Sequence, residues 1–69
     1  MDQKLLLTKA ESVVAAESTR ADFEAADVGR VREETAKAIN EGRVRRFEDL
    51  RNFVHGKFDA IAKEKGLQY

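Results

Sequence analysis

Residues able to carry out catalysis are few and scattered along this 69-residue chain. His55 is the only histidine and cysteine is absent, so an ordinary structural zinc site lacks its usual ligands. Ser12 and Ser18 have no base nearby in sequence and no G-x-S-x-G motif, and the glycines are isolated rather than grouped into a phosphate-binding loop. The acidic pairs at 33–34 and 48–49 fit solvated helix faces. We therefore expect a protein that is not an enzyme and binds no cofactor or metal.

The clearest chemical signal is a group of arginines within a short part of the chain. Its members are Arg30, Arg32, Arg43, Arg45, Arg46 and Arg51. Guanidinium groups bind phosphates, and they also bind carboxylates of a protein partner through two parallel hydrogen bonds. Acidic residues are interleaved with the arginines, which weakens the attraction to a nucleic-acid backbone. We expect contact with a protein partner, and a solvated structural face or a nucleic-acid contact remain as alternatives.

Charge and length limit the class of protein. The chain holds 13 Lys and Arg against 13 Asp and Glu, but these are unevenly distributed. Residues 1–29 carry three cations against six anions, a balance of −3, and residues 30–69 carry ten against seven, a balance of +3. This asymmetry suits self-association, or a partner that faces only one half. Because a chain this short buries only about 60% of its unfolded surface, we expect a homo-oligomer or a complex to add stability.

No sequence feature indicates a membrane segment. The longest apolar run near the N-terminus is Leu5-Leu6-Leu7, which is too short for a signal-peptide core or a membrane span. The absence of cysteine fits the cytoplasm, where disulfides are rare. We expect a cytoplasmic protein without membrane contact.

The first half of the chain has a helical pattern with a weak packing face. Thr8 and Glu11 form a T-x-x-E capping box, which predicts a helix start near Lys9. A heptad-like seam follows at positions 10, 14, 17, 21, 24, 28, 31, 35 and 38. Glutamates interrupt this seam and alanine or valine fills much of the rest, so it lacks the bulk of a strong coiled coil. We expect helical segments at about 9–28 and 30–41.

The boundary between these two segments has two candidate positions. The chain can bend around Ser18-Thr19, where a T-x-x-D pattern offers a restart, or at Gly29, which costs roughly 1 kcal/mol inside a helix. The end of the second segment is clearer. Asn40-Glu41-Gly42 is a stop signal, because glycine is the usual residue of a left-handed helix C-cap.

The last helix, expected at 47–65, carries most of the apolar mass. Its stripe follows Phe47 and is formed by Leu50, Val54, Phe58 and Ile61. Glu48 and Asp49 in the first turn complement the helix dipole, and Gly66 ends the helix. Phe53 lies about 90° from the centre of the stripe. It is therefore either covered by another helix of the same fold or a contact with a partner or second copy.

Residues 28–62 resemble the C-terminal part of small bacterial type II antitoxins of the CopG, ParD and RelB-like groups. The residues that carry the resemblance are Glu41, Gly42, Arg43, Val44, Glu48, Asp49 and Leu50. In such proteins a helix ends in an acidic residue, a Gly-Arg step follows, and a second amphipathic helix begins. The resemblance implies a region that wraps a toxin and blocks its active surface. Residues 2–8 do not match the alternating strand of the ribbon-helix-helix unit with which these antitoxins usually begin.

Together these patterns predict one small all-α domain over residues 1–69, with two or three helices and a dimer held by the weak seam. The leading function is a regulatory inhibitor, such as an antitoxin, that lays its C-terminal helix into a groove on a protein partner. The expected partner-binding residues are Arg43, Arg45, Arg46, Phe47, Leu50, Arg51, Phe53, Val54 and Phe58. The alternatives are a dimeric nucleic-acid-binding regulator that uses the same arginines, and a structural helical dimer without a separate ligand.

Overall fold

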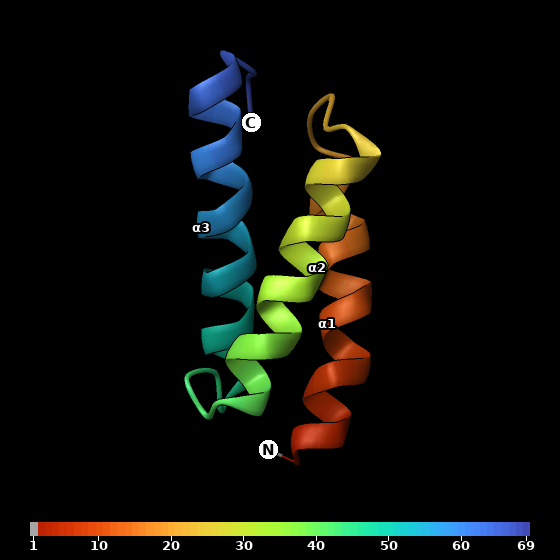
Figure 1. Cartoon of the computed structure of the whole chain (residues 1–69), viewed down its shortest axis with the longest axis vertical. Helices are drawn as coiled ribbons and strands as arrows, with labels where there is room; N and C mark the ends of the chain where they lie inside the picture. The colour runs from red at the N-terminus through yellow and green to blue at the C-terminus, as the bar shows by residue number, and fades with distance from the viewer. Residues whose placement is uncertain (1) are drawn as a thin grey trace.

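The computed structural model describes residues 2–69, which form three α-helices and no strand (Figure 1). The helices are α1 (Gln3–Ser18), α2 (Ala25–Asn40) and α3 (Phe47–Lys65). They lie along a common long direction in a body of 35 × 16 × 16 Å. The N-terminus and the α2–α3 connector lie at one end of the bundle, and the α1–α2 turn and the C-terminus lie at the other. The expected all-α class is confirmed, and the number of helices is three.

Helix α1 begins six residues earlier than expected. Asp2 occupies the N-cap with an extended backbone, and its carbonyl oxygen accepts the amide hydrogen of Leu6. Thr8 lies inside the helix, where its hydroxyl donates to the carbonyl of Lys4 over 3.2 Å. The predicted capping box at Thr8 is therefore wrong. The reason is packing: Leu6 is the first member of the buried stripe, so the helix must already have started before it.

The break between α1 and α2 lies at the first of the two candidate positions. Residues 19–24 form the turn, so the expected segment 9–28 is interrupted. The hydroxyls of Ser18 and Thr19 donate to the carbonyls of Ala15 and Ala16 at the end of α1, over 2.7 and 2.8 Å, where backbone hydrogen bonding within the helix runs out. Gly29 lies within α2 and causes no break.

Two glycines terminate the second and third helices as the sequence predicts. Gly42 follows α2 with φ 77° and Gly66 follows α3 with φ 71°, both in the left-handed region that side-chain-bearing residues rarely adopt. After each glycine, the next amide reaches back to the helix: Arg43 donates to Ala38 and Leu67 donates to Ala62. These are the bonds of a Schellman C-cap. Helix α3 covers the expected range 47–65.

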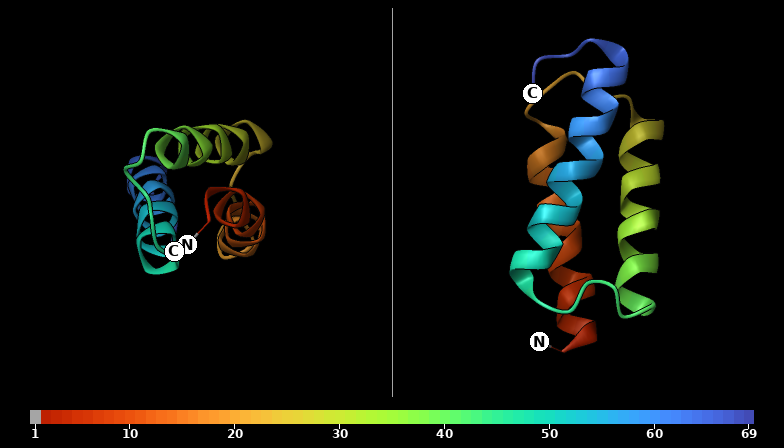
Figure 2. Two further views of the ribbon diagram at one scale, coloured as in Figure 1. Left: turned by 90° about the horizontal axis from the view of Figure 1, so that it is seen from below. Right: turned by 90° about the vertical axis from the view of Figure 1, so that its left-hand side faces the viewer.

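The core is formed where the apolar stripe of α3 meets α1 and α2. Figure 2 shows the three helices arranged around a common centre. The buried residues of the core are Leu6, Ala10, Val14, Val31, Ala38, Ile39, Val44, Leu50, Val54, Phe58 and Ile61. Four of these, Ala10, Val14, Val31 and Ala38, belong to the weak seam that was expected to need a second copy. Within this fold α3 of the same chain covers that seam, because large side chains on α3 supply the bulk that alanine and valine lack. The core is therefore filled without a dimer.

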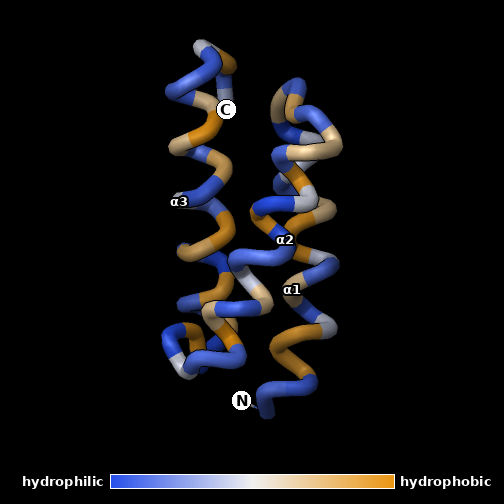
Figure 3. Tube along the Cα trace, viewed as in Figure 1, coloured by the Kyte–Doolittle hydropathy of each residue, from blue (hydrophilic) through white to orange (hydrophobic). Residues whose placement is uncertain are grey.

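Hydropathy alternates along each helix instead of forming a long apolar run (Figure 3). Apolar and polar residues alternate in this way because each helix buries one side in the core and exposes the other to solvent. In the described part of the chain, no helix is both long and apolar enough to cross a membrane.

Candidate functional site

The α2–α3 connector is held in place by one buried side chain between exposed arginines. Val44 is 3% exposed and belongs to the core, whereas Arg43, Arg45 and Arg46 on either side of it are exposed. Arg45 is fixed further, because its Nε donates to the carbonyl of Gly42 over 2.9 Å. Burial of Val44 therefore forces three guanidinium groups to the surface at this end of the bundle.

The arginines of this end differ in whether they are already neutralised. Arg43 lies 2.9 Å from the Glu41 carboxylate and Arg46 lies 3.3 Å from that of Asp49. The hydrogen bond from Arg46 holds the pKa of the Asp49 carboxyl below its ordinary value and raises that of the guanidinium. Between residues 2 and 69, Arg45 and Arg51 form no ion pair. These two keep their charge available for another molecule.

An exposed aromatic ring lies at the first position of α3. Phe47 is 37% exposed, one of two large hydrophobic residues that the described chain leaves open. The ammonium group of Lys9, on α1, lies 5.4 Å from the centre of its ring. A shallow hollow of about 380 Å³ opens beside it, lined by Phe47, Glu48, Arg51, Asn52 and His55. These positions share the flank of α3 that faces α1, and we call this surface the Phe47 hollow.

The nine predicted partner-binding residues divide between the surface and the interior. Arg43, Arg45, Arg46, Phe47 and Arg51 are exposed. Leu50, Val54 and Phe58 are 0% exposed and belong to the core. In this fold the last three side chains cannot reach a groove on a partner. The expected helix-in-groove contact by the whole apolar stripe is therefore incompatible with this structure. The reason is that α1 and α2 of the same chain occupy that face of α3.

Phe53 is half-buried and packs against the core cluster from the flank of α3 that faces α2. The Lys57 ammonium lies 5.3 Å from the centre of its ring and also pairs with Glu34 of α2 over 2.9 Å. Of the two interpretations offered for Phe53, cover by the same fold therefore applies to much of its surface.

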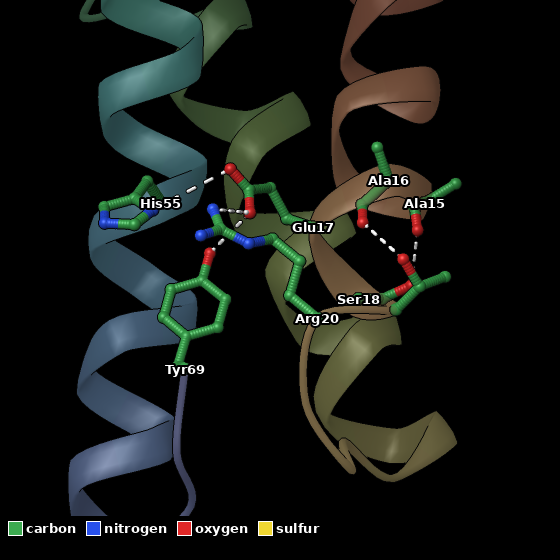
Figure 4. A network of polar contacts seen from close by, with 8 residues as sticks. Ala15, Ala16, Glu17, Ser18, Arg20, His55 and Tyr69 are labelled. Carbon is green, nitrogen blue, oxygen red and sulfur yellow. Dashed lines mark hydrogen bonds and ion pairs between the residues drawn. The ribbon is translucent and has the colours of Figure 1, made fainter.

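The opposite end of the bundle holds a polar cluster around Glu17 (Figure 4). The Tyr69 hydroxyl donates to Glu17 Oε2 over 2.8 Å, and Arg20 Nη1 donates to the same oxygen over 3.0 Å. His55 Nδ1 lies 3.7 Å from Glu17 Oε1. We call Glu17, Arg20, His55 and Tyr69 the Glu17 cluster. It joins the end of α1, the following turn, α3 and the C-terminal segment.

The Glu17 cluster has electrostatics typical of a satisfied structural junction. Burial by itself raises the pKa of the Glu17 carboxyl, but the hydrogen bonds from Tyr69 and Arg20 outweigh burial and hold this pKa below its ordinary value. Burial and the bond to Glu17 raise the pKa of the Tyr69 hydroxyl well above its ordinary value. In residues 2–69, no buried side-chain oxygen or nitrogen lacks a hydrogen-bond partner. These groups therefore stabilise the fold and leave no unmet demand for a ligand.

Aromatic rings pack next to the Glu17 cluster and join it to the core. The Phe23 ring centre lies 4.6 Å from that of Phe58 and 5.5 Å from that of Tyr69. Sequence reasoning interpreted Glu17 only as an interruption of the seam, and it did not assign roles to Tyr69 or Lys9. No spacing in the sequence connects positions 17 and 69, or 9 and 47, since only the folded bundle brings these pairs together.

Among residues 2–69, no three His, Asp or Glu side chains lie close enough together to hold a metal ion. Comparisons of the chain with protein-family models, with curated proteins and with solved structures find no match. The resemblance to type II antitoxins therefore depends on the residues of segment 28–62 alone.

Proposed function

We propose that this chain is a non-enzymatic binding protein that regulates a protein partner by docking the connector end of its bundle onto it. The observation that supports this most is the Phe47 hollow, which combines an exposed aromatic ring with the guanidinium group of Arg51, which forms no ion pair within residues 2–69. Aromatic and arginine side chains are the residue types that contribute most to binding energy in protein interfaces. The contact surface in this proposal is smaller than the predicted one and excludes the three buried residues of α3.

Neutralisation of a toxin is the specific form of this function that the antitoxin resemblance suggests. In that form the connector end would cover the active surface of the toxin, as the Gly42-Arg43 step and the start of α3 imply. Self-association stays a separate proposal for the intact chain. It no longer follows from a shortage of core, and it would have to use the outer surface of the bundle.

Nucleic acid is a weaker candidate partner for the same end. Two of its four arginines are already paired with carboxylates, at 2.9 and 3.3 Å, and Glu48 lies in the hollow itself. Binding to a phosphate backbone needs several unpaired cations along a track.

The test is site-specific photo-crosslinking in the native host. A photoreactive phenylalanine analogue replaces Phe47 in one variant and Ala26, which is exposed on α2, in a control variant. We expect one protein to be crosslinked through position 47 and not through position 26. Adding the purified chain should then change the activity of that purified partner. A partner whose activity is unaffected, or crosslinking that is equal at both positions, would contradict the proposal.

A further inference from the structure

We infer that the Phe47 hollow binds an acidic peptide segment of a protein partner, with one apolar side chain on the Phe47 ring and carboxylates on Lys9 and Arg51. This inference rests on the proposed function and specifies the chemistry of the partner. It also shifts the centre of the expected site from the connector arginines towards α1, because Lys9 belongs to α1 and lies far from those arginines in sequence.

The cations around the ring show the charge that the ligand should carry. Lys9 lies 5.4 Å from the ring centre on one side, and Arg51 follows Phe47 by one helical turn and lines the same hollow. Within the described range neither side chain forms an ion pair, unlike Arg43 and Arg46 beside them. A ligand that offers carboxylates to both cations would therefore gain ion pairs without breaking any that the chain already has.

The apolar element of the ligand follows from the exposed ring. Phe47 is 37% exposed. Covering its ring with a large apolar side chain removes apolar surface from water, and charged groups at the rim then fix the orientation of the ligand. The hollow of about 380 Å³ has room for one or two side chains and is too small for a folded domain to enter.

A carboxylate ligand fits this surface better than a nucleic-acid strand. An aromatic ring flanked by cations also suits a stacked base, but a strand needs a positively charged track for its phosphates. Here Glu48 lies within the hollow, and Glu41 and Asp49 neutralise the neighbouring arginines. Among residues 2–69, the unpaired cations placed at the ring are Lys9 and Arg51, enough for two carboxylates at defined positions.

The experiment titrates the intact chain with three defined probes and follows backbone amide chemical shifts by NMR. The first probe is a helical peptide of about 16 residues, with a central phenylalanine and glutamates about four residues on either side. The second is its twin with glutamine in place of each glutamate. The third is single-stranded oligothymidylate of about 12 nucleotides. We expect the glutamate peptide to bind most tightly and to shift the amides of Lys9, Phe47 and Arg51.

Variants of the chain identify the groups responsible. Arg51→Ala should weaken binding of the glutamate peptide about fivefold, and Lys9→Ala should weaken it about threefold. Glu48→Gln should strengthen it about twofold, because a repelling carboxylate leaves the hollow. Arg32→Ala is the matched control, since Arg32 is exposed on α2 and forms no ion pair among residues 2–69, and it should leave binding unchanged.

The outcomes separate this inference from the proposed function. Equal binding of both peptides, or tighter binding of oligothymidylate, would overturn the acidic-peptide inference, even where crosslinking through position 47 still identifies a regulated partner. Crosslinking that fails while the glutamate peptide binds as expected would contradict the proposed function and leave the hollow's specificity for acidic peptides in place.

Discussion

The two ends of the bundle use charged side chains in opposite ways. At the C-terminal end, Glu17 accepts hydrogen bonds from Tyr69 and Arg20, lies near His55, and is supported by an aromatic layer. At the connector end, Arg45 and Arg51 have no carboxylate partner within the described chain, and a phenylalanine ring is left open beside them. The first end is therefore stabilised internally, whereas the second has interactions left to make. Shifted pKa values occur at both ends, in Glu17 and Tyr69 at one and in Asp49 at the other, because satisfied structural networks also shift pKa values.

The largest expected effect separates the core from both ends. Phe58→Ala should cost roughly 3–5 kcal/mol, because Phe58 is 0% exposed and its loss leaves a cavity under the aromatic layer. Phe53→Ala should cost less, about 1–2 kcal/mol, since that side chain is only partly buried. Circular-dichroism melts and urea titrations measure both. An equal loss of stability would mean that Phe53 contributes to the core as much as Phe58 does.

The next effect tests whether the Glu17 cluster is structural. Glu17→Gln should lower stability by about 1–2 kcal/mol at neutral pH, because it weakens bonds to a charged acceptor that is largely shielded from water. The native pKa of Glu17 is depressed, so its contribution is present above the ordinary value of 4.5 and is lost as the pH falls through the folded-state value. Urea titrations from pH 7 down to acid should show a smaller decline for Glu17→Gln than for the parent chain. An identical decline would contradict the assignment.

The alkaline side provides an independent test of the same cluster. The folded-state pKa of Tyr69 is raised, so its contribution is complete below the ordinary value of 10.0 and is lost as the pH rises through the folded-state value. Tyr69→Phe should remove about 1 kcal/mol at neutral pH through the lost hydrogen bond to Glu17. It should also flatten the stability curve above about pH 10. Arg32→Ala, remote from the cluster, is a control that should leave the alkaline curve unchanged.

A smaller effect concerns the backbone of the connector end. Gly42→Ala should cost about 1 kcal/mol, because Gly42 has φ 77°. Gly56→Ala should instead stabilise the protein by roughly 0.5–1 kcal/mol, since Gly56 lies inside α3 with nothing within 4 Å of an added Cβ atom. Thermal melts of the two variants compare them directly. Destabilisation by both substitutions would mean that a side chain at position 56 is unfavourable for a reason other than helix propensity or steric contact.

The smallest effect belongs to the exposed arginines. Arg43→Ala and Arg51→Ala should each change stability by less than about 0.5 kcal/mol, because exposed charges contribute little to folding. Under the proposed function, the same Arg51→Ala variant should weaken partner binding. Binding loss together with a large loss of stability would instead make Arg51 part of the fold, and the contrast between the two ends would no longer hold.

Local rules recovered several elements of the fold but misplaced two helix starts, those of α1 (expected near Lys9, found at Gln3) and of α2 (expected near Arg30, found at Ala25). The range of α3 and both glycine caps followed from periodicity and from the left-handed preference of glycine, which act within a few residues. The start of α1 was misplaced because the local capping pattern at Thr8 competed with burial of Leu6, and burial prevailed. For the candidate site, the arginines and Phe47 were identified from sequence. Three further residues were expected from the sequence to contact a partner: Leu50, Val54 and Phe58. In the structure they are buried against α1 and α2 of the same chain.

The sequence by itself determined which residues are apolar, where α2 and α3 stop, and that the second half carries the surplus of positive charge. These properties depend on residue type and on neighbours close along the chain. Only the tertiary structure decided which apolar face is covered, which arginines are neutralised, and that Lys9 lies beside Phe47 and Tyr69 beside Glu17. The physical reason is that an amphipathic face specifies only that it must be buried. The partner that buries it is selected by how three helices fill one volume.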